Sequence, residues 1–126
     1  MDRLLWISFG GAVGTAARYL IGLWAGQRFG ASFPYGTLIV NVSGCFLIAA
    51  LMHLAMVNGW PATVRAALTI GFLGGFTTYS SFNYETMRLM EEGAVATAFA
   101  NVTVTLLSGF AAGWLGLLLA RQLAGR

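Results

Sequence analysis

Lysine is absent from this 126-residue chain, and its seven basic residues are all arginine. Cysteine and histidine occur once each, and only four residues are acidic. A single cysteine excludes an internal disulfide. So few reactive side chains cannot assemble a nucleophile, a base and a group that orients them. We therefore expect no enzymatic activity, and no nucleic-acid partner.

Charge as a whole is scarce: 9% of residues are charged, against about 25% in an ordinary soluble domain. Hydrophobic residues make up 58%, and the mean hydropathy is +0.76. Four apolar stretches each reach the ~20 residues that cross a bilayer; they cover residues 4–25, 35–57, 62–90 and 94–120. We predict an all-α integral membrane protein with a single four-helix transmembrane domain over residues 1–126. The short connections leave no room for a soluble domain.

The third apolar stretch carries a helix-breaking sequence at its centre. Gly71, Gly74 and Gly75 precede five consecutive hydroxyl side chains or hydroxyl-bearing rings at residues 77–81. Glycine costs a helix interior about 1 kcal/mol relative to alanine, and Ser and Thr offer the backbone competing hydrogen bonds. We predict a break at residues 74–79. At membrane depth such a break survives only inside protein or beside a polar path, and broken helices commonly form ion sites.

Glycines recur every four residues along the first stretch, in a ladder that Arg18 interrupts; the ladder is Gly10, Gly14, Arg18, Gly22 and Gly26. The fourth stretch has a similar pair, Gly109 and Gly113. Small residues at this spacing let membrane helices pack closely. We expect these glycines to serve packing, partly between subunits.

Polar residues follow one face of the second and fourth stretches. They are Thr37 and Asn41 in the second, and Thr97, Asn101, Thr105 and Ser108 in the fourth. Taken singly, each indicates an interhelical hydrogen bond. Together with the predicted break they favour a hydrated path through a small bundle.

Arg18 is the only charge well inside a predicted span. Cation and proton-coupled transporters usually place a carboxylate at depth, whereas hydroxyls, carboxamide NH2 groups and aromatic edges attract anions. Weak donors also allow an ion to leave, whereas a lysine in the pore would hold an anion too tightly. The path is therefore suited to a small anion.

Arginines divide unevenly between the two ends of the predicted bundle. Arg3, Arg65, Arg121 and Arg126 fall at one end, and Arg28 and Arg88 at the other. Because short-loop Arg bias sets orientation, this weak split is compatible with insertion in both directions, and so with an antiparallel dimer. It is equally compatible with one weakly determined orientation.

Three segments resemble motifs of the Fluc (CrcB) fluoride channels. GFLGGFTTYSSFNYE at residues 71–85 resembles their GFxGGxTTFSTFxxE, GTLIVNVSG at 36–44 their GTLxxNxxG, and GAVGTAARY at 11–19 their GxxGAxxRY/W. The resemblance implies a dual-topology homodimer of antiparallel subunits with two fluoride pores. It implies passive export of fluoride across the bacterial inner membrane.

The same resemblance assigns residues to the pore. Asn41 would be the pore asparagine, and Phe82 the second phenylalanine of the motif. Tyr79 stands where the family has the first phenylalanine, which keeps an aromatic edge and adds a hydroxyl. We also place Ser80, Ser81, Thr37, Thr105 and Ser108 in the fluoride pathway.

A structural sodium ion at the dimer interface is implied as well, held by the backbone carbonyls of Gly74 and Thr77; no organic cofactor is expected. Arg18 would make a vestibule electropositive, with Glu85 nearby. The structural alternatives for Arg18 are an ion pair with Glu85 or a bond to a helix-end carbonyl, and these are compatible with the vestibule role.

Two other kinds of membrane protein fit part of the pattern. A small multidrug transporter also uses four short spans, but it needs a glutamate in its first helix, where this chain has Arg18. A non-transporting assembly subunit would need neither the glycine break nor the polar stripes.

Overall fold

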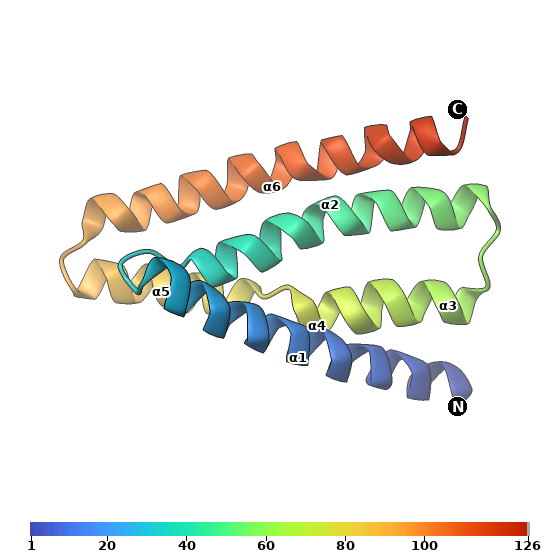
Figure 1. Ribbon diagram of the computed structural model, residues 1–126, viewed down its shortest axis with the longest axis horizontal. Coiled ribbons are helices and arrows are strands. Elements are labelled where there is room, and N and C mark those ends of the chain that lie inside the picture. Colours follow the sequence, from blue (N-terminus) through green and yellow to red (C-terminus); the bar gives the residue numbers. More distant parts are fainter. Residues whose placement is uncertain (126) are drawn as a thin grey trace.

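A computed structural model describes residues 1–125 of the chain, so Arg126, which was counted above among the arginines, lies outside it. As predicted, the fold is all-helical, with no strand in the described part (Figure 1). The elements are α1 (Asp2–Phe29), α2 (Tyr35–Val57), α3 (Ala62–Ala66), the π-helical η1 (Ala67–Leu73), α4 (Gly74–Phe76), α5 (Tyr79–Glu91) and α6 (Val95–Leu123).

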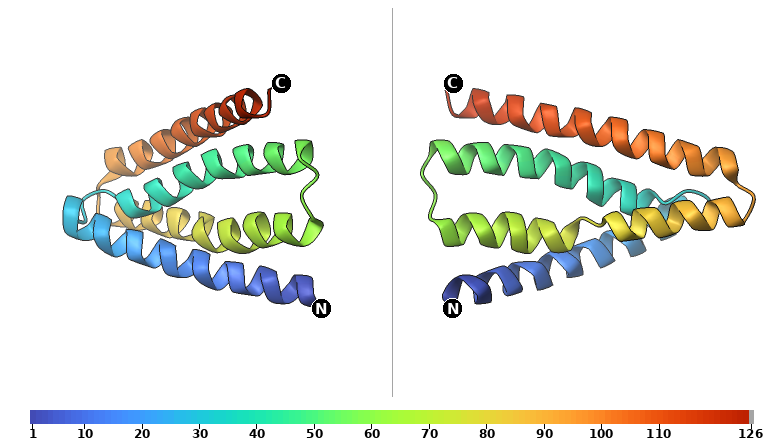
Figure 2. Two further views of the ribbon diagram at one scale, coloured as in Figure 1. Left: turned by 45° about the vertical axis from the view of Figure 1, so that its right-hand side comes forward. Right: turned by 180° about the vertical axis from the view of Figure 1, so that it is seen from behind.

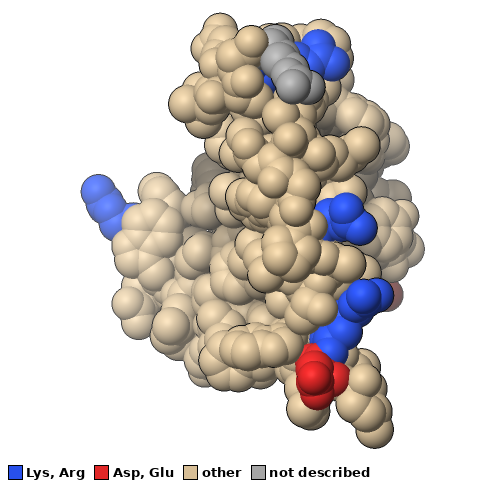
Figure 3. Space-filling model, turned by 90° about the vertical axis from the view of Figure 1, so that its right-hand side faces the viewer, with Lys and Arg blue, Asp and Glu red and all other residues tan. Residues whose placement is uncertain are grey.

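Three of these helices, α1, α2 and α6, are long and apolar enough to cross a membrane. Their large hydrophobic side chains are widely exposed, as at Trp6, Phe99 and Phe110. Figure 3, which views the molecule from the end where the chain termini lie, shows only a few scattered charged side chains. An apolar exterior of this kind is suited to lipid and unsuited to water.

Both termini lie at one end of the molecule, together with the α2–α3 connection (Figure 1). Helix α6 runs beside α2, and α1 runs beside η1 and α4 (Figure 2). The buried core, formed by Val40, Leu73 and Phe76, lies where α2 meets the η1–α4 segment.

Helical backbone runs without a gap from Ala62 to Phe76 and then stops. Thr77 (ψ 157°) and Thr78 (φ −153°, ψ 113°) are extended, and α5 begins at Tyr79. The Thr78 hydroxyl caps α5 by accepting a hydrogen bond from the Ser81 N–H at 3.2 Å, which is the usual role of an N-cap threonine. The extended pair lies within the residues 74–79 where the sequence predicted a break.

Glycine contacts hold this segment against α1. A Cβ on Gly10 would lie 2.5 Å from the Ala67 carbonyl oxygen, and a Cβ on Gly71 would lie 2.5 Å from that of Ile7. A Cβ on Gly14 would overlap the carbonyl of Phe72. Two backbones therefore meet with no side chain between them. Farther along the ladder, a Cβ on either Gly22 or Gly26 would have open space, although a Cβ on Gly36 of α2 would lie 3.0 Å from the Gly22 Cα.

Candidate functional site

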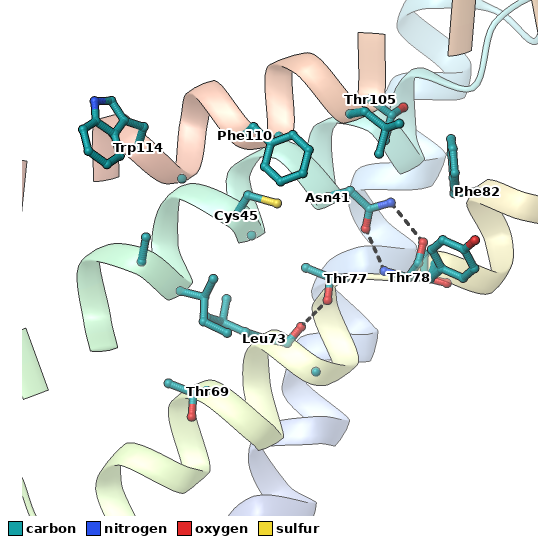
Figure 4. Close-up of a pocket in the computed structure, with 18 of the residues that line it drawn as sticks. Asn41, Cys45, Thr69, Leu73, Thr77, Thr78, Phe82, Thr105, Phe110 and Trp114 are labelled. Atoms are coloured by element: carbon teal, nitrogen blue, oxygen red, sulfur yellow. Dashed lines mark hydrogen bonds between the residues drawn. The ribbon is translucent and has the colours of Figure 1, made fainter. Parts of the chain in front are cut away.

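A groove of about 740 Å³ opens between α2, the η1–α4 segment, α5 and α6 (Figure 4). We call it the Asn41 groove. Most of its wall is apolar, including Leu73, Phe110 and Trp114. Asn41, Thr78, Thr105 and the Phe82 ring gather at one end of it.

Asn41 bridges α2 to the extended backbone. Its Nδ2 donates to the Thr78 carbonyl oxygen at 2.9 Å, and its Oδ1 accepts from the Thr78 N–H at 2.8 Å. Because a backbone N–H can only donate, the Thr78 N–H fixes which end of the carboxamide is oxygen. One hydrogen of the NH2 group is used in this bridge, and the other has no acceptor among residues 1–125.

The Asn41 bridge and the Thr78 cap each take a backbone N–H that would otherwise bond to a carbonyl four residues earlier. In a continuous helix the Thr78 N–H would serve the Gly74 carbonyl, and the Ser81 N–H would serve that of Thr77. These two N–H groups instead bond to Asn41 Oδ1 and to Thr78 Oγ1. Gly74 itself is exposed and lines the Asn41 groove.

Arg18 donates a hydrogen bond to the carbonyl of Gly75, which lies between Gly74 and Thr77 in the chain. Its Nε donates to the Gly75 oxygen at 2.9 Å. Of the two structural partners considered from the sequence, Arg18 therefore takes the helix-end carbonyl. Glu85 accepts instead from the Thr37 hydroxyl, at 2.8 Å on Oε1, and its Oε2 is buried without a hydrogen-bond partner among the described residues.

A second, smaller hollow of about 240 Å³ lies against α1, and we call it the Arg18 pocket. Arg18, Thr37 and Ser81 contribute to its wall. Thr78 lines both this pocket and the Asn41 groove. The extended residue therefore stands between two hollows.

The two aromatic residues of the motif, Tyr79 and Phe82, differ in how exposed they are. Phe82 is buried, whereas Tyr79 is 80% exposed, and their ring centroids lie 5.9 Å apart. Both rings line the Asn41 groove.

The hydroxyls at the start of α5 form a small cluster. The Thr78 hydroxyl donates to Ser81 Oγ at 3.1 Å and lies 3.3 Å from Ser80 Oγ. Because the Thr78 hydroxyl is the donor, the hydrogen of the Ser81 hydroxyl stays free for another acceptor.

On α6 the two predicted site residues differ. Thr105 lines the Asn41 groove, and its hydroxyl donates to Asn101 Oδ1 at 3.4 Å. Ser108 is not part of that lining, and its hydroxyl donates to the Val104 carbonyl of its own helix.

Sequence reasoning missed the central place of Thr78, which provides both partners of Asn41 and the cap of α5. A threonine directly before a new helical stretch is an available signal for a cap. The bond between Thr86 and Asn101 was also missed. No local pattern predicts it, since the two residues lie on different helices.

The fold and this arrangement define a multi-pass integral membrane protein with two hollows, each lined in part by polar side chains, beside an interrupted helix. The chain belongs to the family described as CrcB-like protein, Camphor Resistance (CrcB), which it matches over residues 5–117. It is 51% identical over 124 residues to a fluoride-specific ion channel FluC of Sorangium cellulosum, covering 98% of each chain. It is 50% identical over 126 residues to that of Anaeromyxobacter dehalogenans, covering 99% of this chain and 100% of the relative.

Proposed function

We propose that this protein is a fluoride-specific ion channel that lets fluoride leave the cell passively across the bacterial inner membrane. One observation carries the proposal: Thr78, held by Asn41, lies between the Arg18 pocket and the Asn41 groove. An ion passing from one hollow to the other meets neutral donors at the interruption. Ion conduction involves no chemical step and needs no catalytic groups, so a channel of this family is not an enzyme.

Fluoride is a small anion that keeps its water shell unless donors replace it. The second Asn41 N–H and the hydroxyl of Ser81 are such donors, with Ser80 beside them. The edges of the Phe82 and Tyr79 rings carry partial positive charge. Several weak contacts suit conduction because an ion must leave as readily as it enters.

Arg18 would draw anions into its pocket while its Nε holds the Gly75 carbonyl. Glu85 and Thr37 would border the same route, with the Thr37 hydrogen turned to the carboxylate. Thr105 belongs to the groove wall in this proposal, whereas Ser108 lies on the same helix outside that lining. Each hydroxyl already has an acceptor.

Residues 62–90 form the third of four spans in this proposal, interrupted at Thr77 and Thr78. The Asn41 carboxamide and the Thr78 and Ser81 hydroxyls beside the extended residues support it, because extended backbone at membrane depth needs protein or water beside it. The first, second and fourth spans correspond to α1, α2 and α6.

A second copy of the chain, antiparallel to the first, would cover the Asn41 groove and complete two pores. The apolar wall and the exposed Phe110 and Trp114 support this, because a groove so apolar is otherwise filled by lipid. Labelling of the N-terminus in sealed vesicles tests it: a dual-topology dimer leaves about half of the termini accessible from outside, whereas a single orientation leaves nearly all or none.

Sodium would lie at the centre of that dimer. The carbonyls of Gly74 and Thr77 fit the role, since both have lost their helical donors and a hard cation prefers oxygen ligands. Each of the two subunits would provide these two carbonyls. The positive charge of the ion would balance the partial negative charge of their oxygens. Replacing sodium by a large organic cation should lower the thermal stability of the dimer, and an unchanged stability would remove sodium from the proposal.

Fluoride efflux from liposomes tests the function itself. Purified protein should release loaded fluoride within seconds of adding a potassium ionophore, and chloride should stay inside under the same conditions. Protein-free liposomes are the control. Comparable chloride release would reject the selectivity, and retained fluoride would reject the channel.

A further inference from the structure

Asn101 is the one polar side chain in the described part of the chain that is fully buried, with 1% of its surface exposed. It lies on α6 and faces α5, beyond the end of the Asn41 groove. A buried carboxamide is costly unless its donors and acceptor are used. The bonds that Asn101 makes therefore indicate what it does.

Three hydrogen bonds join Asn101 to the pathway on both sides. Asn101 Nδ2 donates to the Thr86 hydroxyl at 2.9 Å, and that hydroxyl donates to the Phe82 carbonyl at 2.8 Å. On the other side, Asn101 Oδ1 accepts from the Thr105 hydroxyl at 3.4 Å. The relay runs from the groove wall on α6 to the backbone of Phe82 on α5.

The direction of each hydrogen in this relay is determined. The single hydrogen of the Thr86 hydroxyl goes to the Phe82 carbonyl, so its oxygen can only accept from Asn101. The NH2 group of Asn101 must then face Thr86, and its oxygen must face Thr105. Thr105 consequently turns its hydrogen inward and its lone pairs toward the groove.

The relay acts where α5 has few other attachments. Its buried side chains are Phe82 and Leu89, and Thr86 lies on the same face one turn from each. Phe82 is also the last residue of the first turn that carries Tyr79, Ser80 and Ser81. Fixing Thr86 fixes the rotation of that turn about the helix axis.

We propose that Asn101 is a positioning residue of the channel: through Thr86 it sets the place of the Phe82 ring and the Ser80–Ser81 hydroxyls in the pathway. This inference rests on the proposed function and adds to it a residue that need not touch the ion. It assigns to Asn101 a control over conduction through each open channel, beyond its part in stability.

A double-mutant cycle measures this control. Asn101→Leu has a similar shape and removes the amide, and Thr86→Val removes the acceptor. We expect each to lower the fluoride rate per active channel about tenfold, and the double variant to stay within about twofold of the lower single, because both act on one relay. Thr86→Ser keeps the hydroxyl and should stay within about twofold of the unmodified protein. Thr103→Val is the matched control, because Thr103 is exposed on the same helix, lies outside both hollows and has no side-chain hydrogen bond within residues 1–125.

The readout separates positioning from folding. Initial efflux rate per vesicle reports conduction, and the fraction of vesicles that keep their fluoride reports how many channels are active. A drop only in the active fraction would assign Asn101 to stability and overturn the proposal. So would independent effects that multiply to about a hundredfold in the double variant, or a Thr86→Val rate equal to that of the unmodified protein.

Asn101→Leu can fail to assemble, and the comparison of Thr86→Val with Thr86→Ser then decides the matter alone. If the unmodified protein itself releases no fluoride, both the channel and the role of Asn101 are rejected. If it releases fluoride and both Asn101→Leu and Thr86→Val leave the rate per channel unchanged, only the role of Asn101 is rejected.

Discussion

The helical backbone before Thr77 and the helix after Thr78 are held in different ways. Before the interruption, η1 and α4 meet α1 backbone to backbone at glycines such as Gly14 and Gly71. After it, α5 is tied to α2 and α6 by side-chain hydrogen bonds, Thr37 to Glu85 and Asn101 to Thr86. Contacts between backbones tolerate no added atom, whereas side-chain ties can be removed one at a time. We therefore expect substitutions on the first side to decide assembly, and those on the second to adjust transport.

The largest effect is expected at Gly14. In Gly14→Val the new Cβ would overlap the Phe72 carbonyl and lie 3.0 Å from the Phe76 nitrogen, so α1 must move away from η1. Overpacking costs about 1–3 kcal/mol, and more where backbone is the obstacle. We expect no monodisperse dimer in size-exclusion chromatography.

Gly26→Val is the matched control, because it makes the same change on the same helix with nothing within 4 Å of the new Cβ. Equal loss of dimer in both variants would show that helix propensity, rather than the contact with η1, is responsible.

A charge at Asn41 should abolish transport and leave the protein assembled. Asn41→Asp loses the donor to the Thr78 carbonyl and places a negative charge in the path of an anion. At ~4 Å and an effective dielectric constant of ~20 the repulsion is about 4 kcal/mol. We expect a fluoride rate lower by roughly a hundredfold or more.

Asn58→Asp adds the same charge at the exposed end of α2 and serves as its control. An unchanged fluoride rate in Asn41→Asp would remove Asn41 from the pathway.

A smaller effect is expected from Thr37→Val, which removes one side-chain tie and keeps the shape. The Glu85 carboxylate loses the 2.8 Å hydrogen bond from the Thr37 hydroxyl and must accept one from water or from another group. A hydrogen bond to a carboxylate contributes about 1.5–3 kcal/mol, and water replaces part of it, so the fluoride rate should change by about tenfold or less while the dimer remains. A loss of assembly as complete as that in Gly14→Val would contradict the contrast between the two sides of Thr77.

Sequence patterns predicted the helical, membrane-spanning character of the chain and the family to which it belongs. Long apolar stretches end at polar or Gly-Pro-rich turns in the sequence, and α1, α2 and α6 end at such turns. The extended residues Thr77 and Thr78 follow a glycine pair and begin a hydroxyl run, which is a local signal.

The contacts across helices were not predictable in this way. Periodicity shows which residues share a face, but not which face meets which neighbour. The bridge from Asn41 to Thr78 and the bond from Asn101 to Thr86 join residues 37 and 15 positions apart. The π-helical turns at Ala67–Leu73 also have no sequence signature of their own. They lie in close contact with α1, and a contact between two helices is not visible in the local sequence.

The bridge between Asn41 and Thr78 uses both hydrogen-bonding groups of one backbone residue, and the Ser81 N–H is taken by the Thr78 hydroxyl. In the proposed pathway, those main-chain groups are therefore not available to the ion. The donors that the ion would meet at that level belong to side chains, so single amino-acid substitutions would change them. A filter built from peptide amides would be almost indifferent to such replacements.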